Sequence, residues 1–265
     1  MSQQGFPAWM ILHIPHDSTV IPSDVRSQFL LSDAELELEI QRMTDHFTHA
    51  LFAVPNNDSN VVRAPVSRLV VDVERFSDDT QESMAKRGMG ALYEVTSHLA
   101  PLRRSLTQDE RLTLMKNWYH PHHERLEARV TNCIDRYGKC FVLDAHSFPN
   151  VPLPYEMADP ATVRPDICIG TDPFHTPPGL AKAFVEAFSG SGWSVAVNDP
   201  FAGALVPASR YRCDPRVKAV MIEINRDLYF EPLNSTPKPD FTQVAEQIRS
   251  CCANALATFD VPTYE

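Results

Sequence analysis

Short apolar runs alternate along the chain with longer segments in which apolar residues recur at helical spacing. An apolar run of a few residues bounded by polar or turn-forming residues is typical of a buried β-strand. The predicted strands lie near residues 9–14, 60–64, 68–73, 140–145, 166–170, 193–198 and 217–224. Because helical segments separate them, we expect an α/β fold with a mixed, mostly parallel central sheet flanked by helices.

Two of the helices are marked by their first residues. Ser32 and Thr107 each precede a helical segment, and Glu35 and Glu110 follow three residues later, which is the spacing of a capping box. The first helix is predicted to run to about Phe52 along one apolar face. That face comprises Leu36, Ile40, Met43, Phe47 and Leu51.

Proline and glycine mark the other helix boundaries. The helix that follows Thr107 contains Pro121, which is expected to kink or break it. The next helix is predicted to begin at Pro177–Pro178 and to end at the Ser/Gly-rich residues 189–192. A last amphipathic helix is predicted over residues 239–258.

Size and composition suit one domain. The chain has 265 residues, of which 43% are hydrophobic and 22% charged, as in ordinary globular proteins, and no shift in composition marks a boundary. We therefore predict a single catalytic domain over residues 1–265. The prolines gather at 149–178 and 231–239, which predicts long ordered loops over the carboxyl edge of the sheet, where α/β folds bind ligands.

Charge and cysteine content restrict the partners and the compartment. The formal net charge of −10 argues against nucleic acid and anionic membranes as partners, but a local arginine cluster can still bind a small anionic substrate. The six cysteines form no CxxC pair and are typical of reduced thiols. No signal-peptide pattern opens the sequence and no run of about 20 apolar residues occurs, so we expect a cytoplasmic protein.

Histidines and acids at predicted strand ends indicate a metal site. His16 follows the first strand, and Asp144 and His146 share one face at the end of another. Two histidines with a carboxylate base are the parts of a hydrolytic zinc site. Asp45, predicted on the first helix opposite its apolar face, and His13 are alternative third ligands.

Glu223 interrupts the apolar run of the last strand. A buried carboxylate is usually paired or functional, because burying it alone costs several kcal/mol. Desolvation raises its pKa, which suits a general base acting on water. The alternative is a structural ion pair, for example with Arg226.

Two arginines flank the strand predicted at 68–73. Arg68 and Arg75 have the planar guanidinium that grips carboxylates, so one could bind a substrate carboxylate and the other an oxyanion. The alternative is a pair of ion bridges to Asp72 and Glu74. The chain lacks GxSxG, P-loop and GxGxxG motifs, so serine hydrolase, NTPase and dinucleotide-binding functions have no support.

A series of short motifs resembles the N-formylglutamate amidohydrolase family over most of the chain. The motifs are His13-Ile-Pro-His16, Thr44-Asp-His-Phe47, Ser67-Arg68 through Asp72 and Arg75, Pro121-His-His123, Asp144-Ala-His-Ser147, Asn198-Asp-Pro-Phe201 and Ile222-Glu-Ile-Asn-Arg226. That family is similar to zinc carboxypeptidases and aspartoacylases, whose fold is a mixed eight-stranded sheet flanked by helices.

The resemblance implies a zinc-dependent enzyme that hydrolyses N-formyl-L-glutamate to formate and L-glutamate in histidine degradation. Its site would comprise one Zn2+ on His16 and His146, with Asp45 as the candidate third ligand, Glu223 as general base and Arg68 as oxyanion stabiliser. The expected substrate-binding residues are Arg75, Asn225, Arg226, His123 and Asn198.

Two positions depart from the wider pattern. Thr19 stands where the superfamily has a glutamate ligand, which makes Asp45 the candidate substitute, and Glu74 stands where an asparagine precedes the second arginine. The second departure leaves open a different substrate, so an N-acyl amino acid deacylase or a carboxypeptidase is the alternative function. A module that only binds an acidic metabolite is a third hypothesis, which the set of His16, His146 and Glu223 disfavours.

Overall fold

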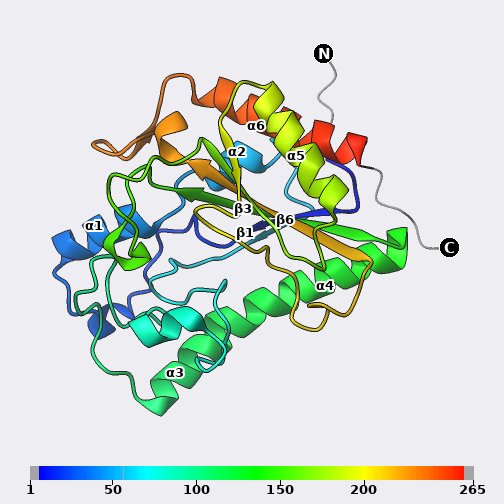
Figure 1. Cartoon of the computed structure of the whole chain (residues 1–265). Coiled ribbons are helices and arrows are strands. Elements are labelled where there is room, and N and C mark those ends of the chain that lie inside the picture. The colour runs from blue at the N-terminus through cyan, green and yellow to red at the C-terminus, as the bar shows by residue number, and fades with distance from the viewer. Residues whose placement is uncertain (1–5, 56, 260–265) are drawn as a thin grey trace.

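The computed structural model of the chain describes residues 6–55 and 57–259, and a twisted central sheet organises them (Figure 1). Its strands follow the order β2-β1-β3-β6-β4-β5. They are β1 (Met10–Ile14), β2 (Val61–Arg63), β3 (Cys140–Phe148), β4 (Ile167–Gly170), β5 (Val195–Val197) and β6 (Val217–Asn225). The first four strands in this order are parallel, and β4 and β5 run opposite to them. The predicted mixed, mostly parallel α/β fold is therefore confirmed.

The number of strands differs from the eight that the resemblance implies. Six of those described form the main sheet, and β7 (Phe230–Glu231) pairs with β8 (Thr236–Pro237) in a separate small ribbon. The segment 68–73 is not a strand. Backbone bonds from Val70 and Val71 to the carbonyl of Ser67 make it a turn, and its apolar side chains fill a core beside the sheet. A short apolar run predicts burial but not the partner that buries it.

Helices cover both faces of the sheet (Figure 1). On one face lie α2 (Thr48–Phe52), α5 (Pro178–Gly190) and α6 (Phe241–Thr258), and on the other lies α4 (His120–Tyr137). Side chains alternate along β3, so Phe141 and Leu143 pack toward α5 and α6, whereas Cys140 and Val142 pack toward α4. All nine residues of β3 and of β6 are buried, as central strands of a two-faced sheet require.

The first predicted helix is two helices. The capping box of Ser32 and Glu35 is present, but α1 (Asp33–Met43) ends before Thr44, and α2 begins after Phe47, whose φ is 61°. The amide of Asp45 donates instead to the carbonyl of His16, at 2.9 Å. Asp45 thus lies in the break between the helices and not on a helix as predicted. The break directs it toward the end of β1.

The other helix predictions are confirmed within a few residues. The Thr107 box starts α3 (Gln108–Leu114), and a π-helical turn, Met115–Tyr119, joins it to α4. Pro121 follows that turn, so its missing N–H is accommodated by the turn and the chain remains helical. α5 and α6 lie where the proline, glycine and amphipathic patterns place them.

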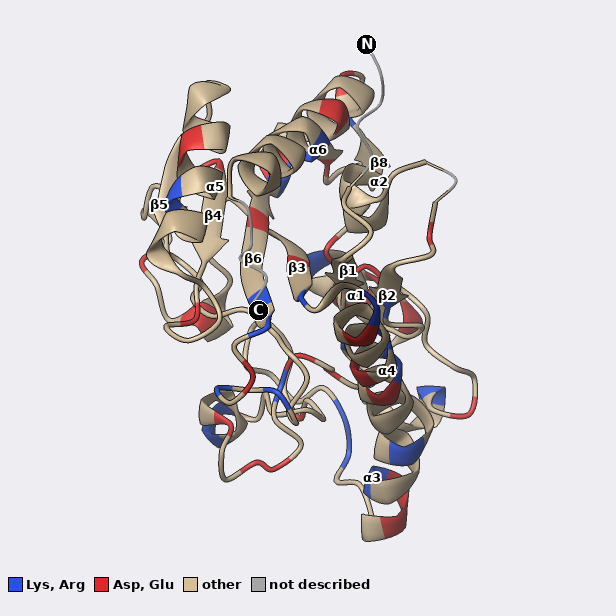
Figure 2. Cartoon of the chain, turned by 90° about the vertical axis from the view of Figure 1, so that its right-hand side faces the viewer, with Lys and Arg blue, Asp and Glu red and all other residues tan. Residues whose placement is uncertain are grey.

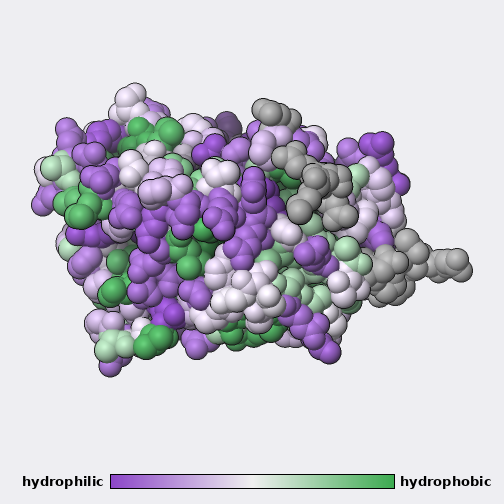
Figure 3. Space-filling view, turned by 90° about the horizontal axis from the view of Figure 1, so that it is seen from above, coloured by the Kyte–Doolittle hydropathy of each residue, from purple (hydrophilic) through white to green (hydrophobic). Residues whose placement is uncertain are grey.

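Charged residues of both signs lie along α4, whereas α5 and α6 each have one acidic and one basic residue (Figure 2). Hydrophilic residues dominate the face seen from above, with apolar residues in small groups (Figure 3). Within the described ranges, no helix is both long and apolar enough to cross a membrane.

Candidate active site

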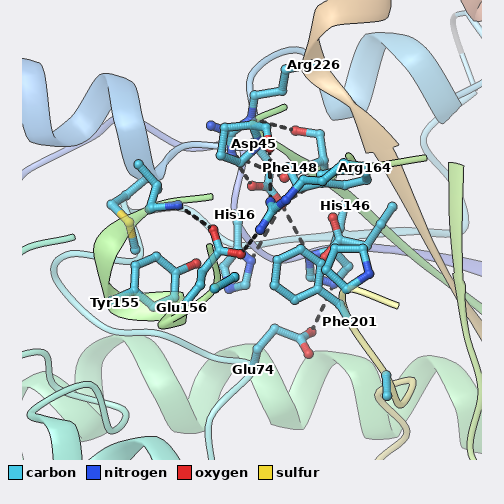
Figure 4. Close-up of a pocket in the computed structure, with 18 of the residues that line it drawn as sticks. His16, Asp45, Glu74, His146, Phe148, Tyr155, Glu156, Arg164, Phe201 and Arg226 are labelled. Carbon is cyan, nitrogen blue, oxygen red and sulfur yellow. Dashed lines mark hydrogen bonds and ion pairs between the residues drawn. The ribbon is translucent and has the colours of Figure 1, made fainter. Parts of the chain in front are cut away.

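Three predicted ligands meet beyond the carboxyl ends of β1 and β3. His16 follows β1, His146 lies near the end of β3, and Asp45 comes from the break between α1 and α2. Asp45 Oδ2 is 3.2 Å from His146 Nδ1 and 3.7 Å from His16 Nδ1. All three side chains are buried (Figure 4).

Their geometry fits a metal ion. A tetrahedral zinc site with bonds of about 2.0–2.1 Å has ligand–ligand distances of about 3.4 Å, between the two distances measured. His16 Nδ1 is buried and has no hydrogen-bond partner among the described residues, as an uncoordinated ligand would. Thr19, which the sequence resemblance aligns with a glutamate ligand, is exposed. These three residues could therefore hold a divalent metal.

Carboxylates orient both histidines by binding the ring nitrogen that faces away from Asp45. His16 Nε2 donates to Asp72 Oδ1 at 2.8 Å, and His146 Nε2 donates to Asp144 Oδ1 at 3.1 Å. Each bond leaves Nδ1 directed toward Asp45, the arrangement that fixes the orientation of ligating histidines in metal sites. The shared strand face predicts the Asp144 contact, whereas the only contact that the sequence predicts for Asp72 is an ion bridge to an arginine.

Asp72 also organises the arginines. Its Oδ2 accepts from Arg68 Nη2 at 2.8 Å and from the hydroxyl of Tyr93, and Arg75 Nε lies 3.7 Å away. The ion bridges that were the alternative for Arg68 and Arg75 are thus present at Asp72, yet both arginines line the same cavity as the histidines. Although burial would raise it, Arg68 and His16 hold the pKa of Asp72 well below its usual range.

Replacing Asp72 by asparagine should weaken metal binding. The amide cannot supply the charge that orients His16 and Arg68, and loss of such outer contacts costs about 10–100-fold in metal affinity. Competition with a chromophoric chelator measures this affinity, with Asp58→Asn as an exposed control. An unchanged affinity in Asp72→Asn would show that Asp72 does not position His16 for a metal.

Arg226 holds Asp45 in place. Its Nη2 donates to Asp45 Oδ1 at 3.0 Å, Nε to Ser147 Oγ at 3.1 Å and Nη1 to the carbonyl of Arg42 at 2.7 Å. These contacts occupy the guanidinium, so Arg226 supports Asp45 and is not free to bind substrate. Although burial acts in the opposite direction, the hydrogen bond from His146 and the charges of His16 and Arg226 hold the pKa of Asp45 well below its usual range.

Glu223 lies beside this group. It is the register partner of His146 on β6 and lines the cavity. Its Oε2 is buried and has no partner in the described part of the chain. Burial raises the pKa of Glu223 to about 8, although the charges of His146 and Arg226 lower it. Arg226 pairs with Asp45, so the predicted alternative of a Glu223–Arg226 ion pair is wrong.

A cavity of about 650 Å³ opens over these residues. Arg68, Arg75 and Glu74 lie on its wall. The loop between β3 and β4 contributes further residues, of which Tyr155, Glu156 and Arg164 are seen in Figure 4. Those from the loop include Leu153, Tyr155, Glu156 and Arg164. The proline-rich segment from 149 thus lies over the site, as the sequence predicts.

Three of the expected substrate-binding residues do not line this cavity. At least one polar atom of each contacts another protein group. His123 Nε2 bonds to the carbonyl of Val73, Asn198 bonds to Thr171, and Asn225 bonds to Asn150 and to the carbonyl of Pro165. The structure therefore does not bring His123, Asn198 or Asn225 to the metal-binding group, because each faces a different loop.

His13 belongs to a neighbouring buried group. Its Nδ1 lies 2.8 Å from Asp144 and 3.2 Å from Glu74, and its Nε2 lies 2.8 Å from His122 Nε2. Asp144 thereby joins His13 to His146. Because the His13 ring is directed to these partners, the structure groups Asp45, and not His13, with His16 and His146.

Comparison with known proteins identifies the family of the chain. The family model of N-formylglutamate amidohydrolase matches residues 8–230. The crystal structure of N-formylglutamate amidohydrolase from Ralstonia eutropha JMP134 is similar, with a TM-score of 0.80 and 22% identity over 96% of this chain and 94% of that one. A gene product of Agrobacterium tumefaciens has a TM-score of 0.69 and 22% identity over 94% and 91%. No curated protein matches the chain. At these identities the two structures establish the shared fold.

Proposed function

Because the chain belongs to the N-formylglutamate amidohydrolase family, we propose that it hydrolyses N-formyl-L-glutamate to formate and L-glutamate. The observation that carries the proposal is the meeting in one cavity of a buried triad that could hold a metal, two arginines and Glu223, whose Oε2 has no partner among the described residues. We further propose zinc as the metal, one ion per chain, and a cytoplasmic role in histidine degradation, as the sequence resemblance implies. We also propose that the chain forms a single catalytic domain. The similarity to zinc carboxypeptidases stays a prediction from the sequence.

Each group in the cavity has a role in this reaction. A divalent metal on His16, Asp45 and His146 would lower the pKa of a bound water toward about 7 and polarise the formyl carbonyl. Glu223 takes a proton from the attacking water and passes it to the leaving nitrogen. Arg68, held by Asp72 and Tyr93, stabilises the negative charge that develops on the carbonyl oxygen.

Arg75 is the candidate anchor for a substrate carboxylate. Its Nε is buried and lacks a hydrogen-bond partner within the described ranges, and its ion pairs with Asp72 and Glu82 are long, at 3.7 and 3.8 Å. A carboxylate could complete the donor set of this guanidinium.

Metal content and formate release, measured on one purified sample, test the proposal. We expect about one zinc per chain and turnover of N-formyl-L-glutamate that a chelator abolishes and added zinc restores. Zinc without turnover would retain the metal site and reject this substrate, in which case acetyl and peptide substrates test the pocket beside Glu74 and Arg75. If the protein holds no metal and shows no turnover even after zinc is added, the proposed function is refuted.

A further inference from the structure

Arg164 is a buried arginine in the cavity wall whose position is set by two aromatic rings. Its side chain is 1% exposed. The guanidinium carbon lies 5.5 Å from the ring centre of Phe148 and 5.7 Å from that of Phe201. Phe148 ends β3, two residues after His146, and Phe201 follows β5. Two separate parts of the fold therefore hold the guanidinium in the cavity that contains the metal-binding group.

The donors of Arg164 are only partly used. Nη1 donates to the carbonyl of Pro149 at 3.0 Å, and Nη2 donates to Glu156 Oε2. Nε is buried, and no described residue accepts a bond from it. The Nε–Nη2 edge of a guanidinium matches the two oxygens of a carboxylate. In Arg164, Nη2 has an acceptor and Nε has none among the described residues.

Glu156 cannot fill the second half in this position. Its other oxygen, Oε1, accepts from the amide of Leu153 at 2.9 Å. The contact with Arg164 is therefore monodentate. It balances the buried charge of Arg164, which would be unfavourable if left unpaired. Figure 4 shows the two residues with the dashed contact between them, above the side chain of Glu74.

Arg226, in the same cavity wall, is an arginine whose donor nitrogens all bind protein oxygens. Its Nε, Nη1 and Nη2 all donate to protein oxygens. Arg164 and Arg75 differ from it, because the Nε of each has no hydrogen-bond partner among the described residues. Buried donors are normally satisfied, so two unpaired ones in a single cavity indicate acceptors supplied by a ligand.

From this geometry we propose that Arg164 binds a second carboxylate of the substrate and that Glu156 occupies its place until substrate enters. The site then selects compounds with two carboxylates, one at Arg75 and one at Arg164, which for the reaction means N-acyl amino acids with an acidic side chain. The substrate carboxylate replaces Glu156 at Nη2 and also pairs with Nε. One carboxylate is exchanged for another, so the charge around Arg164 stays balanced. The role in hydrolysis rests on the proposed function, whereas the carboxylate subsite does not.

Equilibrium binding tests the subsite without requiring turnover. Calorimetric titration of the metal-loaded protein compares glutarate with pentanoate, which has the same five-carbon chain and one carboxylate less. We expect glutarate to bind at least ~10-fold more tightly, as a bond between charged groups provides. Arg164→Gln should reduce that ratio to below about 3-fold and leave pentanoate binding unchanged.

Glu156→Gln provides the second variant. The amide keeps its size and can still accept from Leu153, but it competes less well for Arg164, so glutarate should bind several-fold more tightly while pentanoate binding stays the same. The matched control is Arg212→Gln, which removes an arginine that contacts Tyr211 and Asp172 outside this cavity and should change neither ligand.

Three results would overturn the subsite: equal binding of glutarate and pentanoate by the wild type, an equal loss of both in Arg164→Gln, or weaker glutarate binding in Glu156→Gln. If Arg164→Gln does not fold, the direction of the Glu156→Gln change decides. Glutarate binding that depends on Arg164, in a protein that does not release formate, would refute the proposed function and leave the subsite standing. Formate release from N-formyl-L-glutamate and N-formyl-L-norvaline with equal kcat/KM would support hydrolysis of formyl amino acids and refute the carboxylate subsite at Arg164.

Discussion

Glu223→Gln is expected to lower kcat for N-formyl-L-glutamate by about 10²–10⁴-fold, the usual contribution of a general base. The amide matches the carboxylate in size but cannot take a proton from water. Metal content should stay at the wild-type level, because Glu223 is not in the group formed by His16, Asp45 and His146. Steady-state kinetics and metal analysis of the same samples measure the two effects.

A suitable control is Glu39→Gln, which alters a buried glutamate that bonds to Ser97 outside the cavity. Its kcat should remain within about twofold of wild type, because it has no part in proton transfer. Near-normal turnover in Glu223→Gln would refute the general-base role, and loss of metal in that variant would place Glu223 among the ligands.

The same substitution should stabilise the metal-free protein at high pH. Burial raises the pKa of Glu223 to about 8 in the folded state, against 4.5 for an ordinary glutamate. Between these values the folded protein retains a proton that the unfolded chain has lost, so this residue makes the free energy of unfolding fall as pH rises from about 4.5 to about 8. Glutamine does not ionise, so Glu223→Gln avoids this fall in the free energy of unfolding, which is on the order of a few kcal/mol.

Urea unfolding of the chelator-treated proteins measures this effect. The stability difference between Glu223→Gln and wild type should be small near pH 5 and fully developed above about pH 8. A difference that is the same at both pH values would mean that ionisation of Glu223 is not the cause. Lower turnover together with higher stability is the trade-off expected when a functional carboxylate is buried at a cost to folding.

Asp45→Asn is expected to reduce metal affinity at least ~10²-fold and turnover with it, because a neutral amide is a poor replacement for a carboxylate ligand. The substitution also leaves the buried guanidinium of Arg226 without its counter-charge, and breaking such a pair destabilises a protein by about 3–5 kcal/mol. Metal analysis and thermal unfolding measure the two consequences.

Part of the activity of Asp45→Asn should return at high zinc concentration. Asp58→Asn, at an exposed acid that pairs with His49, should behave like wild type. One tightly bound zinc per chain in Asp45→Asn would instead require a different third ligand.

Much of this site could be predicted from the sequence because its residues stand at the ends of regular elements. Alternation along β3 places Asp144 and His146 on one face, and the structure joins them at 3.1 Å. Glu223 is conspicuous as an acid inside an apolar run, and the structure buries it without a partner for Oε2 among the described residues. In both cases the prediction depends on the pattern of residues along a single strand, which the local sequence contains.

Other features depend on contacts between distant segments. The run 68–73 has the composition of a strand, but it packs in a loop core, where Asp72 meets His16. The helical pattern of 33–52 continues through Asp45, yet the carbonyl of His16 and the side chain of Arg226 draw that residue out of the helix. Nothing in the local sequence of Arg164 indicates that Phe148 and Phe201 contact it.

The sequence by itself determined the fold class, the strand ends that carry His16 and His146, and the buried position of Glu223, since apolar periodicity and helix-capping residues act over a few neighbours. Only the tertiary structure decided which acid joins the histidines, which arginines are occupied by protein carboxylates, and that His123, Asn198 and Asn225 face other loops. These outcomes depend on how side chains far apart in the chain satisfy one another's charges and hydrogen bonds once buried, and no local pattern encodes that choice.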